Sequence, residues 1–162
     1  MADTDTDLYR SCQTRSLGKG KATARTDRFI RNEGASSLYP NMGFTRKDGS
    51  VRPPDITTET DTDGDIWVPN VSDESTEGVS VSKTRGGFGY SSWAYFLIPD
   101  GTTIPAGLDV APSPTKRDKG HYSIRCRTRM RFDTYQGALD NLARNAIVKA
   151  TQQGVPVLYF KA

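Results

Sequence analysis

The sequence predicts an α+β fold built from mainly antiparallel strands. Short runs in which apolar and polar residues alternate recur along the chain, and one long amphipathic stretch follows them near the C-terminus. This order, with strands first and the long helix late, differs from the regular alternation of βαβ units. At 162 residues the chain has the size of one domain, and we expect a single domain over residues 1–162.

In the first half, few segments show a clear pattern. Residues 1–7 are polar and acidic and are expected to form a disordered leader, and residues 8–12 are predicted as the first strand. A short helix is predicted near residues 24–33. The composition of residues 36–77 shifts to Pro, Gly, Thr and Asp, which predicts loops with one short strand over residues 66–68.

Within these loops, Asp61, Asp63 and Asp65 alternate along one turn. A calcium loop starting at Asp61 needs Gly at its sixth position and Glu at its twelfth, and here those positions hold Ile66 and Ser72. The sequence therefore predicts an acidic turn rather than a metal site.

The second half contains stronger patterns. Strands are predicted over residues 79–82, 90–98, 108–111 and 155–160. Residues 122–132 also alternate regularly, which predicts one continuous strand with four arginines on one face. These arginines are Arg125, Arg127, Arg129 and Arg131.

The clearest helix follows this strand. Asp133 is expected to be its N-cap, with Gln136 at capping-box spacing, and Gly154 is expected to end it in a left-handed conformation. Between them an apolar stripe recurs at every third or fourth position. The stripe consists of Leu139, Leu142, Ala143, Ala146, Ile147 and Ala150.

Charge is distributed unevenly along the chain. Residues 1–80 carry 10 Lys and Arg against 14 Asp and Glu, whereas residues 81–162 carry 12 against 5, a net charge of +7. The second half is therefore the expected site for a nucleotide, a nucleic acid or an acidic partner, with a solvated basic surface as the equal alternative. The four arginines on one predicted strand favour an anion or an acidic partner surface in this half, because like charges at alternate positions repel each other unless an anion lies nearby.

Other classes are disfavoured. Two cysteines, Cys12 and Cys126, and a single histidine fall short of a disulfide framework or a four-ligand zinc site, so no metal is expected. Buried free thiols are expected, with a single bridge between the two cysteines as the alternative. There is no apolar run of roughly 20 residues and no cleavable leader pattern. We expect a monomer that does not enter membranes and is exported, if at all, without a cleavable signal peptide.

Four segments in the second half resemble a known toxin family in both order and spacing. They are Phe96–Pro105 (FLIPDGTTIP), Gly107–Val110 (GLDV), His121–Ile124 (HYSI) and Ala138–Ile147 (ALDNLARNAI), with Leu8–Arg10 and Gly78–Val81 as weaker extensions. They are similar to the type VI secretion exported toxins of pseudomonads, a family of ADP-ribosyltransferase-like toxins. The resemblance covers somewhat over half of the chain.

This resemblance implies a fold and a function. The fold would consist of two mainly antiparallel sheets packed around a nicotinamide cleft, with peripheral helices. The function would be that of a toxin acting in the cytoplasm of a target cell, with NAD as the substrate from which ADP-ribose is transferred to a cellular protein or RNA. A cognate immunity protein would neutralise the toxin by covering the cleft.

The resemblance also implies site residues. Arg10 on the first strand would hold NAD, because a guanidinium fork can bind two phosphate oxygens, and Ser80 would support the nicotinamide. Both are expected to be catalytic as well as substrate-binding. Tyr9, Phe88 and Tyr90 are expected to complete the dinucleotide site.

The sequence departs from the family at the catalytic carboxylate. Glu77 is the last glutamate of the chain, so the late glutamate of ordinary ADP-ribosyltransferases has no counterpart. Three alternatives stay open: Asp133 or Asp118 replaces it, His121 acts instead as the catalytic residue, or NAD binds without this chemistry.

Two rival functions remain beside the NAD-directed toxin. An NAD-consuming enzyme similar to RNA 2′-phosphotransferases would use Arg and His in place of the glutamate. A non-enzymatic toxin would bind nucleic acid or protein through the basic half of the chain.

Overall fold

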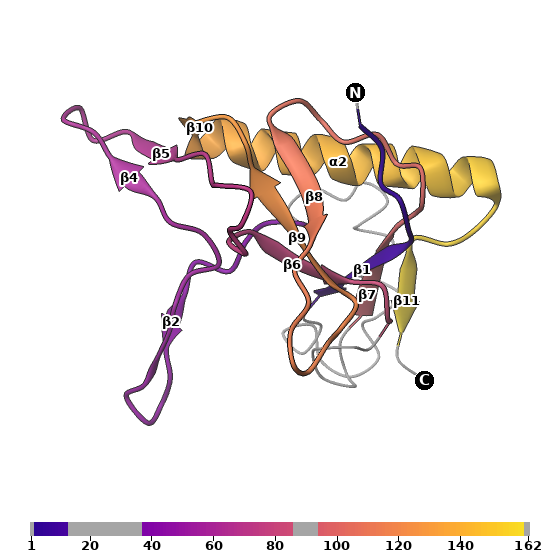
Figure 1. Ribbon diagram of the computed structural model, residues 1–162, viewed down its shortest axis with the longest axis horizontal. Coiled ribbons are helices and arrows are strands. Elements are labelled where there is room, and N and C mark those ends of the chain that lie inside the picture. Colours follow the sequence, from indigo (N-terminus) through magenta and orange to yellow (C-terminus); the bar gives the residue numbers. More distant parts are fainter. Residues whose placement is uncertain (1, 13–36, 86–93, 161–162) are drawn as a thin grey trace.

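The structure, a computed structural model, describes residues 2–12, 37–85 and 94–160 (Figure 1). Its centre is a six-stranded sheet in the order β11-β7-β1-β6-β9-β8, in which all neighbours are antiparallel. The strands are β1 (Leu8–Cys12), β6 (Val79–Ser82), β7 (Ala94–Ile98), β8 (Leu108–Pro112), β9 (His121–Cys126) and β11 (Leu158–Phe160).

Two smaller antiparallel sheets project from this body. One has the order β10-β5-β4, and the other is a hairpin of β2 and β3 (Figure 1). Their strands are β2 (Phe44–Thr45), β3 (Val51–Arg52), β4 (Glu59–Thr60), β5 (Ile66–Val68) and β10 (Met130–Arg131). The predicted α+β class with antiparallel sheets is confirmed.

One helix, α2 (Phe132–Gln153), lies along the large sheet and is the one helix among the described residues. It packs against β7 of the large sheet and against β5 and β10 of the small one. Its buried residues contain the predicted stripe apart from Ile147, which is partly buried against the core. In the part of the chain that the structure describes, no helix has the length and apolar character needed to cross a membrane.

The two ends of α2 differ in how well the sequence predicts them. Gly154 ends the helix with φ 69° and ψ 29°, as predicted. The predicted N-cap at Asp133 is wrong, because β10 runs directly into the helix and Arg131 occupies the cap position without a side-chain cap. Asp133 instead lies in the first turn, where its charge favours the positive end of the helix dipole.

The predicted continuous strand over residues 122–132 is wrong as well. β9 ends at Cys126, the next three residues leave the large sheet, and β10 pairs with β5 of the small sheet. The chain changes sheets at this point, so the four arginines do not share one face.

Other predictions agree closely with the structure. β1 and β5 have the predicted bounds, and the last strand is shorter than predicted, beginning only at Leu158. Asp61 organises the acidic turn by accepting the backbone N–H of Asp63 and of Asp65 at 2.9 Å each, so the turn prediction is confirmed. Cys126 is a buried free thiol, as expected. The predicted helix near residues 24–33 and the Cys12 side chain lie outside the described residues.

The expected disordered leader does not hold for residues 2–7. Thr4 is buried, its hydroxyl donates to the Pro99 carbonyl at 2.7 Å, and Ile104 N–H donates to the Ala2 carbonyl at 2.9 Å. The segment runs beside the turn that follows β7 because its backbone groups find partners there. Composition alone does not reveal such a distant partner.

Candidate active site

The two faces of the large sheet differ in chemistry. Val79 and Val81 of β6 belong to the core under α2. Successive side chains of a strand point to opposite faces, so Ser80 and Ser82 point away from the helix. Gly78 lets β6 lie close to β9, since a Cβ at this residue, with φ 155°, would lie 2.3 Å from the Ile124 carbonyl oxygen.

The strand register assembles a polar row on the face opposite the helix. Tyr9 pairs with Ser82, Ser82 pairs with His121, and Ser80 pairs with Ser123. Residues paired across a sheet share a face, so these side chains from β1, β6 and β9 are neighbours. We call this group of Tyr9, Ser80, Ser82, His121 and Ser123 the polar sheet face.

His121 is held at the edge of the polar sheet face by a chain of hydroxyl groups. Its Nδ1 lies 2.7 Å from Ser113 Oγ and 2.9 Å from the Ser113 carbonyl oxygen. Ser113 Oγ lies 2.8 Å from Ser123 Oγ, and Ser123 donates to the Thr76 carbonyl at 3.0 Å. Ser113 and Ser123 are buried and His121 is half-buried, so the ring is fixed from its protected side.

Arg10 lies close to Ser80 but contacts its backbone. The guanidinium donates to the Ser80 carbonyl at 2.9 Å and to the Tyr39 carbonyl at 3.1 Å. Arg10 pairs with Phe96, a core residue, so its side chain leaves β1 on the helix side of the sheet. The structure thus brings Arg10 to Ser80 while the Ser80 hydroxyl points to the opposite face.

Tyr9 belongs to an aromatic and cationic group at the β11 edge. Its ring meets that of Tyr159 edge to face, with centroids 6.0 Å apart, and the Arg85 guanidinium stacks 4.8 Å from the Tyr159 centroid. Burial raises the pKa of Tyr9, the charges of Asp7 and Tyr159 add to this effect, and Arg85 opposes it. Phe88 and Tyr90, the other predicted aromatic residues of the site, lie outside the described residues.

Cations gather at the end of the sheet where His121 lies. The backbone N–H of Lys83 donates to the Gly120 carbonyl at 3.0 Å, which joins the end of β6 to the β8–β9 loop. We call Arg85, Lys116, Arg117 and Lys119 the cationic rim; the Lys83 ammonium lies over the Tyr122 ring, 5.8 Å from its centroid, on the helix side of the sheet. No carboxylate within the described ranges forms an ion pair with any member of the rim.

Two aspartates were candidates for the missing carboxylate, and the structure separates them. Asp118 is buried three residues before His121; one of its oxygens accepts the Gly120 N–H at 3.1 Å. Its other oxygen, Oδ2, is buried without a hydrogen-bond partner among the residues that the structure describes. Asp133 lies beyond the other end of β9, which spans about 16 Å from His121 to Cys126 at the rise of a strand. Only Asp118 is near His121.

The four arginines after Tyr122 are neutralised by the protein itself. Arg125 forms two hydrogen bonds of 2.8 Å with Asp109, and its Nη1 donates to the Asp73 carbonyl at 2.7 Å. These hydrogen bonds to Asp109 raise the pKa of Arg125, and burial works against them. The further pairs are Arg127 with Asp73, Arg129 with Glu59 at 3.7 Å, and Arg131 with Asp65 at 3.1 Å. The anion expected beside these arginines is thus supplied largely by the acidic first half of the chain.

Sequence reasoning missed several residues of this region. Ser113 and Tyr159 stand in no motif, and only the pairing of β8 with β9 and of β11 with β7 brings them to the site. Arg85 was not among the predicted site residues either. Joining the predicted strands over residues 108–111 and 122–132 into a hairpin would have placed Ser113 opposite His121, and this pairing was the one feature of the sequence from which Ser113 could have been found.

Comparison with known proteins identifies the family of the chain. No curated protein matches the chain. The family model described as Tse2 ADP-ribosyltransferase toxin matches residues 6–151, a range that includes the whole polar sheet face and the whole cationic rim. On this match, the chain belongs to the Tse2 ADP-ribosyltransferase toxin family.

Proposed function

We propose that this toxin transfers ADP-ribose from NAD to a protein or RNA of the cell it poisons, and that NAD binds across the polar sheet face. The observation that carries the proposal is the juxtaposition of that face with the cationic rim. A dinucleotide presents ribose hydroxyls, an aromatic amide and two phosphates. The site offers serine and histidine side chains, tyrosine rings and cations without a carboxylate partner among the described residues.

In this arrangement the cationic rim holds the pyrophosphate. Arg85 is the best-placed member, because it already stacks on Tyr159 and keeps its fork of N–H groups for phosphate oxygens. Tyr9 and Tyr159 provide aromatic surface next to it. Ser80, which is half-buried, would fix a polar group of ribose or nicotinamide, whereas the Ser82 hydroxyl is fully buried and accepts the Thr84 N–H at 3.1 Å.

His121 and Asp118 share the role of the absent glutamate. As the bond between ribose and nicotinamide breaks, positive charge develops on the ribose, and a nearby carboxylate stabilises it. The Asp118 Oδ2, buried and without a hydrogen-bond partner among the described residues, supports this assignment. His121 then takes the proton of the attacking acceptor.

Arg10 acts as a positioning residue in this proposal. Two of its N–H groups donate to the Ser80 and Tyr39 carbonyls, so the guanidinium supports the backbone of β6 from the helix side. Its removal would shift Ser80 without deleting a direct phosphate contact. We therefore expect Arg10→Lys, which keeps the charge but loses the fork, to be nearly as inactive as Arg10→Ala.

The rival functions remain as outcomes of one experiment. The purified chain is incubated with a lysate and with NAD labelled either on the adenylate or on the nicotinamide. We expect nicotinamide release together with transfer of the adenylate label to a macromolecule, and protease or ribonuclease digestion then tells protein from RNA. Absence of both release and transfer would remove the enzymatic proposal and leave the binding toxin.

Matched variants assign any signal to this site. His121→Ala and Asp118→Asn should lower nicotinamide release by about 10² or more, the size of a lost acid–base or charge-stabilising group. Lys47→Ala, a cation in the β2–β3 hairpin outside the rim, should leave release unchanged. Equal loss in all three variants would contradict the assignment.

The same proposal includes where the toxin acts and what restrains it. NAD, the proposed substrate, is available in the cytoplasm of a target cell, so we place its action there. An immunity protein that covers the polar sheet face would need acidic side chains opposite the cationic rim. Co-expression of such a protein should suppress NAD consumption and growth arrest together.

A further inference from the structure

We infer that Ser113 and Ser123 form a hydroxyl relay that fixes His121 in one tautomer, with the proton on Nδ1 and the lone pair on Nε2. The inference rests on the proposed function for its catalytic meaning. The tautomer itself follows from the hydrogen bonds alone and requires no substrate.

The relay has one consistent direction. A carbonyl oxygen only accepts, so the single hydroxyl proton of Ser123 goes to Thr76 O, 3.0 Å away. The 2.8 Å contact between the Ser113 and Ser123 oxygens must then use the proton of Ser113. Ser113 has no second proton to give, so in its 2.7 Å contact with His121 the Nδ1 atom is the donor.

A second contact favours the same tautomer. His121 Nδ1 lies 2.9 Å from the Ser113 carbonyl oxygen, which cannot donate. An unprotonated Nδ1 would set two lone pairs against each other at this distance. Nδ1 therefore carries a proton that is shared between the carbonyl and the hydroxyl oxygen of Ser113.

This arrangement prepares His121 for one direction of proton transfer. With Nδ1 protonated, the neutral ring has its lone pair on Nε2, so Nε2 is the atom that accepts a proton. In the transfer step, the O–H or N–H proton of the acceptor moves to Nε2. At the same time, a lone pair on that oxygen or nitrogen atom of the acceptor forms the bond to ribose C1′. The bond from C1′ to the nicotinamide nitrogen breaks, and its electron pair leaves with neutral nicotinamide. The imidazolium keeps its Nδ1–H donation to Ser113 throughout.

The first test measures the tautomer directly. His121 is the single histidine of the chain, so a long-range hydrogen–nitrogen NMR spectrum of the isotope-labelled full chain shows one imidazole. In alkaline solution, where the ring is neutral, we expect a protonated Nδ1 and an unprotonated Nε2. A spectrum dominated by the Nε2–H tautomer would overturn the inference, whether or not the protein turns over NAD.

The second test breaks the relay at its far end. Ser123→Ala frees the Ser113 proton, which can then be donated to Nδ1 in competition with the donation from Nδ1 to the Ser113 carbonyl, so we expect the Nε2–H tautomer to appear beside the original one in the spectrum. We also expect kcat for nicotinamide release to fall roughly tenfold, with KM for NAD nearly unchanged, because only the orientation of the proton acceptor is disturbed. Ser11→Ala, on the same sheet face but outside the relay, should change neither the tautomer nor kcat. An unchanged tautomer in a folded Ser123→Ala variant would refute the relay.

Discussion

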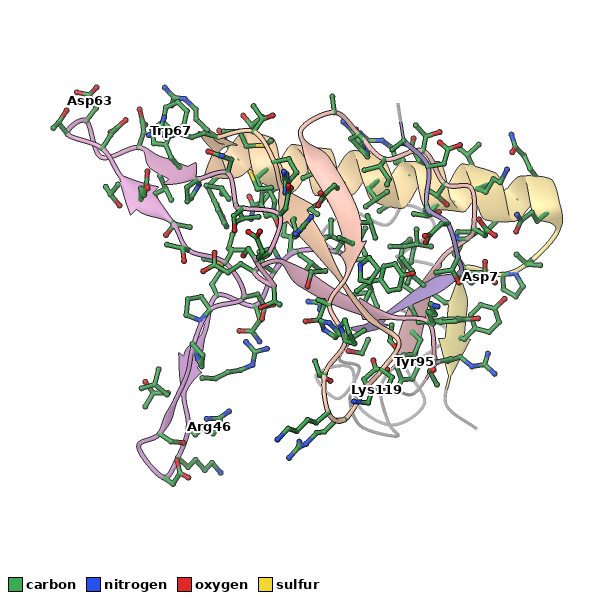
Figure 2. All side chains as sticks on the ribbon, viewed as in Figure 1. Asp7, Arg46, Asp63, Trp67, Tyr95 and Lys119 are labelled. Atoms are coloured by element: carbon green, nitrogen blue, oxygen red, sulfur yellow. The ribbon has the colours of Figure 1, made fainter. Side chains whose placement is uncertain are left out.

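Cations gather at both ends of β9, but what surrounds them differs. At the Cys126 end, each arginine from Arg125 to Arg131 has a carboxylate partner, and both Arg129 and Arg131 also lie over the Trp67 ring. At the His121 end, the cationic rim has no such partner among the described residues. Figure 2 shows these ends as separate regions, with Trp67 beside β10 and Lys119 at the tip of the β8–β9 loop.

The difference separates two uses of positive charge. The arginines at the Cys126 end form ion pairs and hydrogen bonds with the acidic loops of the first half. These contacts hold the loops against β9 and β10 and stabilise the fold. Charges without an internal partner raise the local potential and attract anions. Net charge along the sequence adds the two kinds together, so it does not distinguish the four neutralised arginines from the cationic rim.

The largest expected effect is on stability at the neutralised end. Arg125→Met should lower the free energy of unfolding by about 3–5 kcal/mol, because it leaves Asp109 and several backbone carbonyls without their partner in a site where the Arg125 side chain is 7% exposed. Urea unfolding measures the loss. Arg131→Met, whose side chain is 51% exposed, is the control and should cost less than about 1 kcal/mol. Equal losses would erase the distinction between the buried and the exposed pair.

The next effect is on substrate binding at the cationic rim. The double variant Arg85→Ala and Lys119→Ala should raise KM for NAD roughly 30-fold, which corresponds to about 2 kcal/mol, with little change in kcat or stability. Steady-state kinetics of nicotinamide release measure this change. The pair Arg46→Ala and Lys47→Ala, in the β2–β3 hairpin, removes the same charge elsewhere. If both double variants behave alike, total charge rather than the rim sets the affinity.

Salt should produce a smaller change of the same sign. Raising the salt concentration from about 0.1 to about 1 M shortens the screening length from about 10 to about 3 Å, so KM for NAD should rise several-fold in the natural protein. The rim double variant should respond less, since the charges that are screened are already absent. A KM that is independent of salt in both proteins would argue against phosphate binding by the rim.

The smallest expected effect concerns the stability of the protein in acid and the acidic turn at Asp61, to which the Trp67 indole donates a hydrogen bond. The Trp67 indole N–H and the backbone N–H groups of Asp65 and Asp63 donate to Asp61 and lower the pKa of its carboxyl group. A lowered pKa in the folded state gives a stabilising contribution that is present above the unfolded value and is lost as pH falls below about 4. Asp61→Asn should therefore narrow the difference between the urea midpoints measured near pH 6 and near pH 3. An unchanged difference would show that this turn does not couple to unfolding.

Local patterns predicted much of the fold. Alternation gave the bounds of β1 and β5, the apolar stripe gave α2, and Gly154 gave its end, because each depends on neighbours within a few residues. The prediction failed at residues 127–131, where the alternation continues in the sequence although the chain passes from one sheet to another. No local rule distinguishes a long strand from two short strands in different sheets.

The sequence predicted only part of the candidate site, because strand register decides which side chains share a face. Tyr9, Ser80 and His121 were singled out by a family resemblance, and the register of β1, β6 and β9 brings them onto one face. Arg10 was expected on that face but lies on the other, because its neighbour across the sheet is the core residue Phe96. The choice of Asp118 over Asp133 depended on which end of β9 each residue occupies.

By itself, the sequence determined the α+β class, the long helix with its left-handed end, the acidic turn and the toxin family. Each of these depends on residue types and on their spacing along the chain. Only the tertiary structure decided which cations are neutralised, which face each side chain occupies and which hydroxyls hold His121. These properties depend on strand register and on contacts between residues as far apart as Thr76 and Ser123. The spacing of residues along the chain does not specify strand register or such long-range contacts.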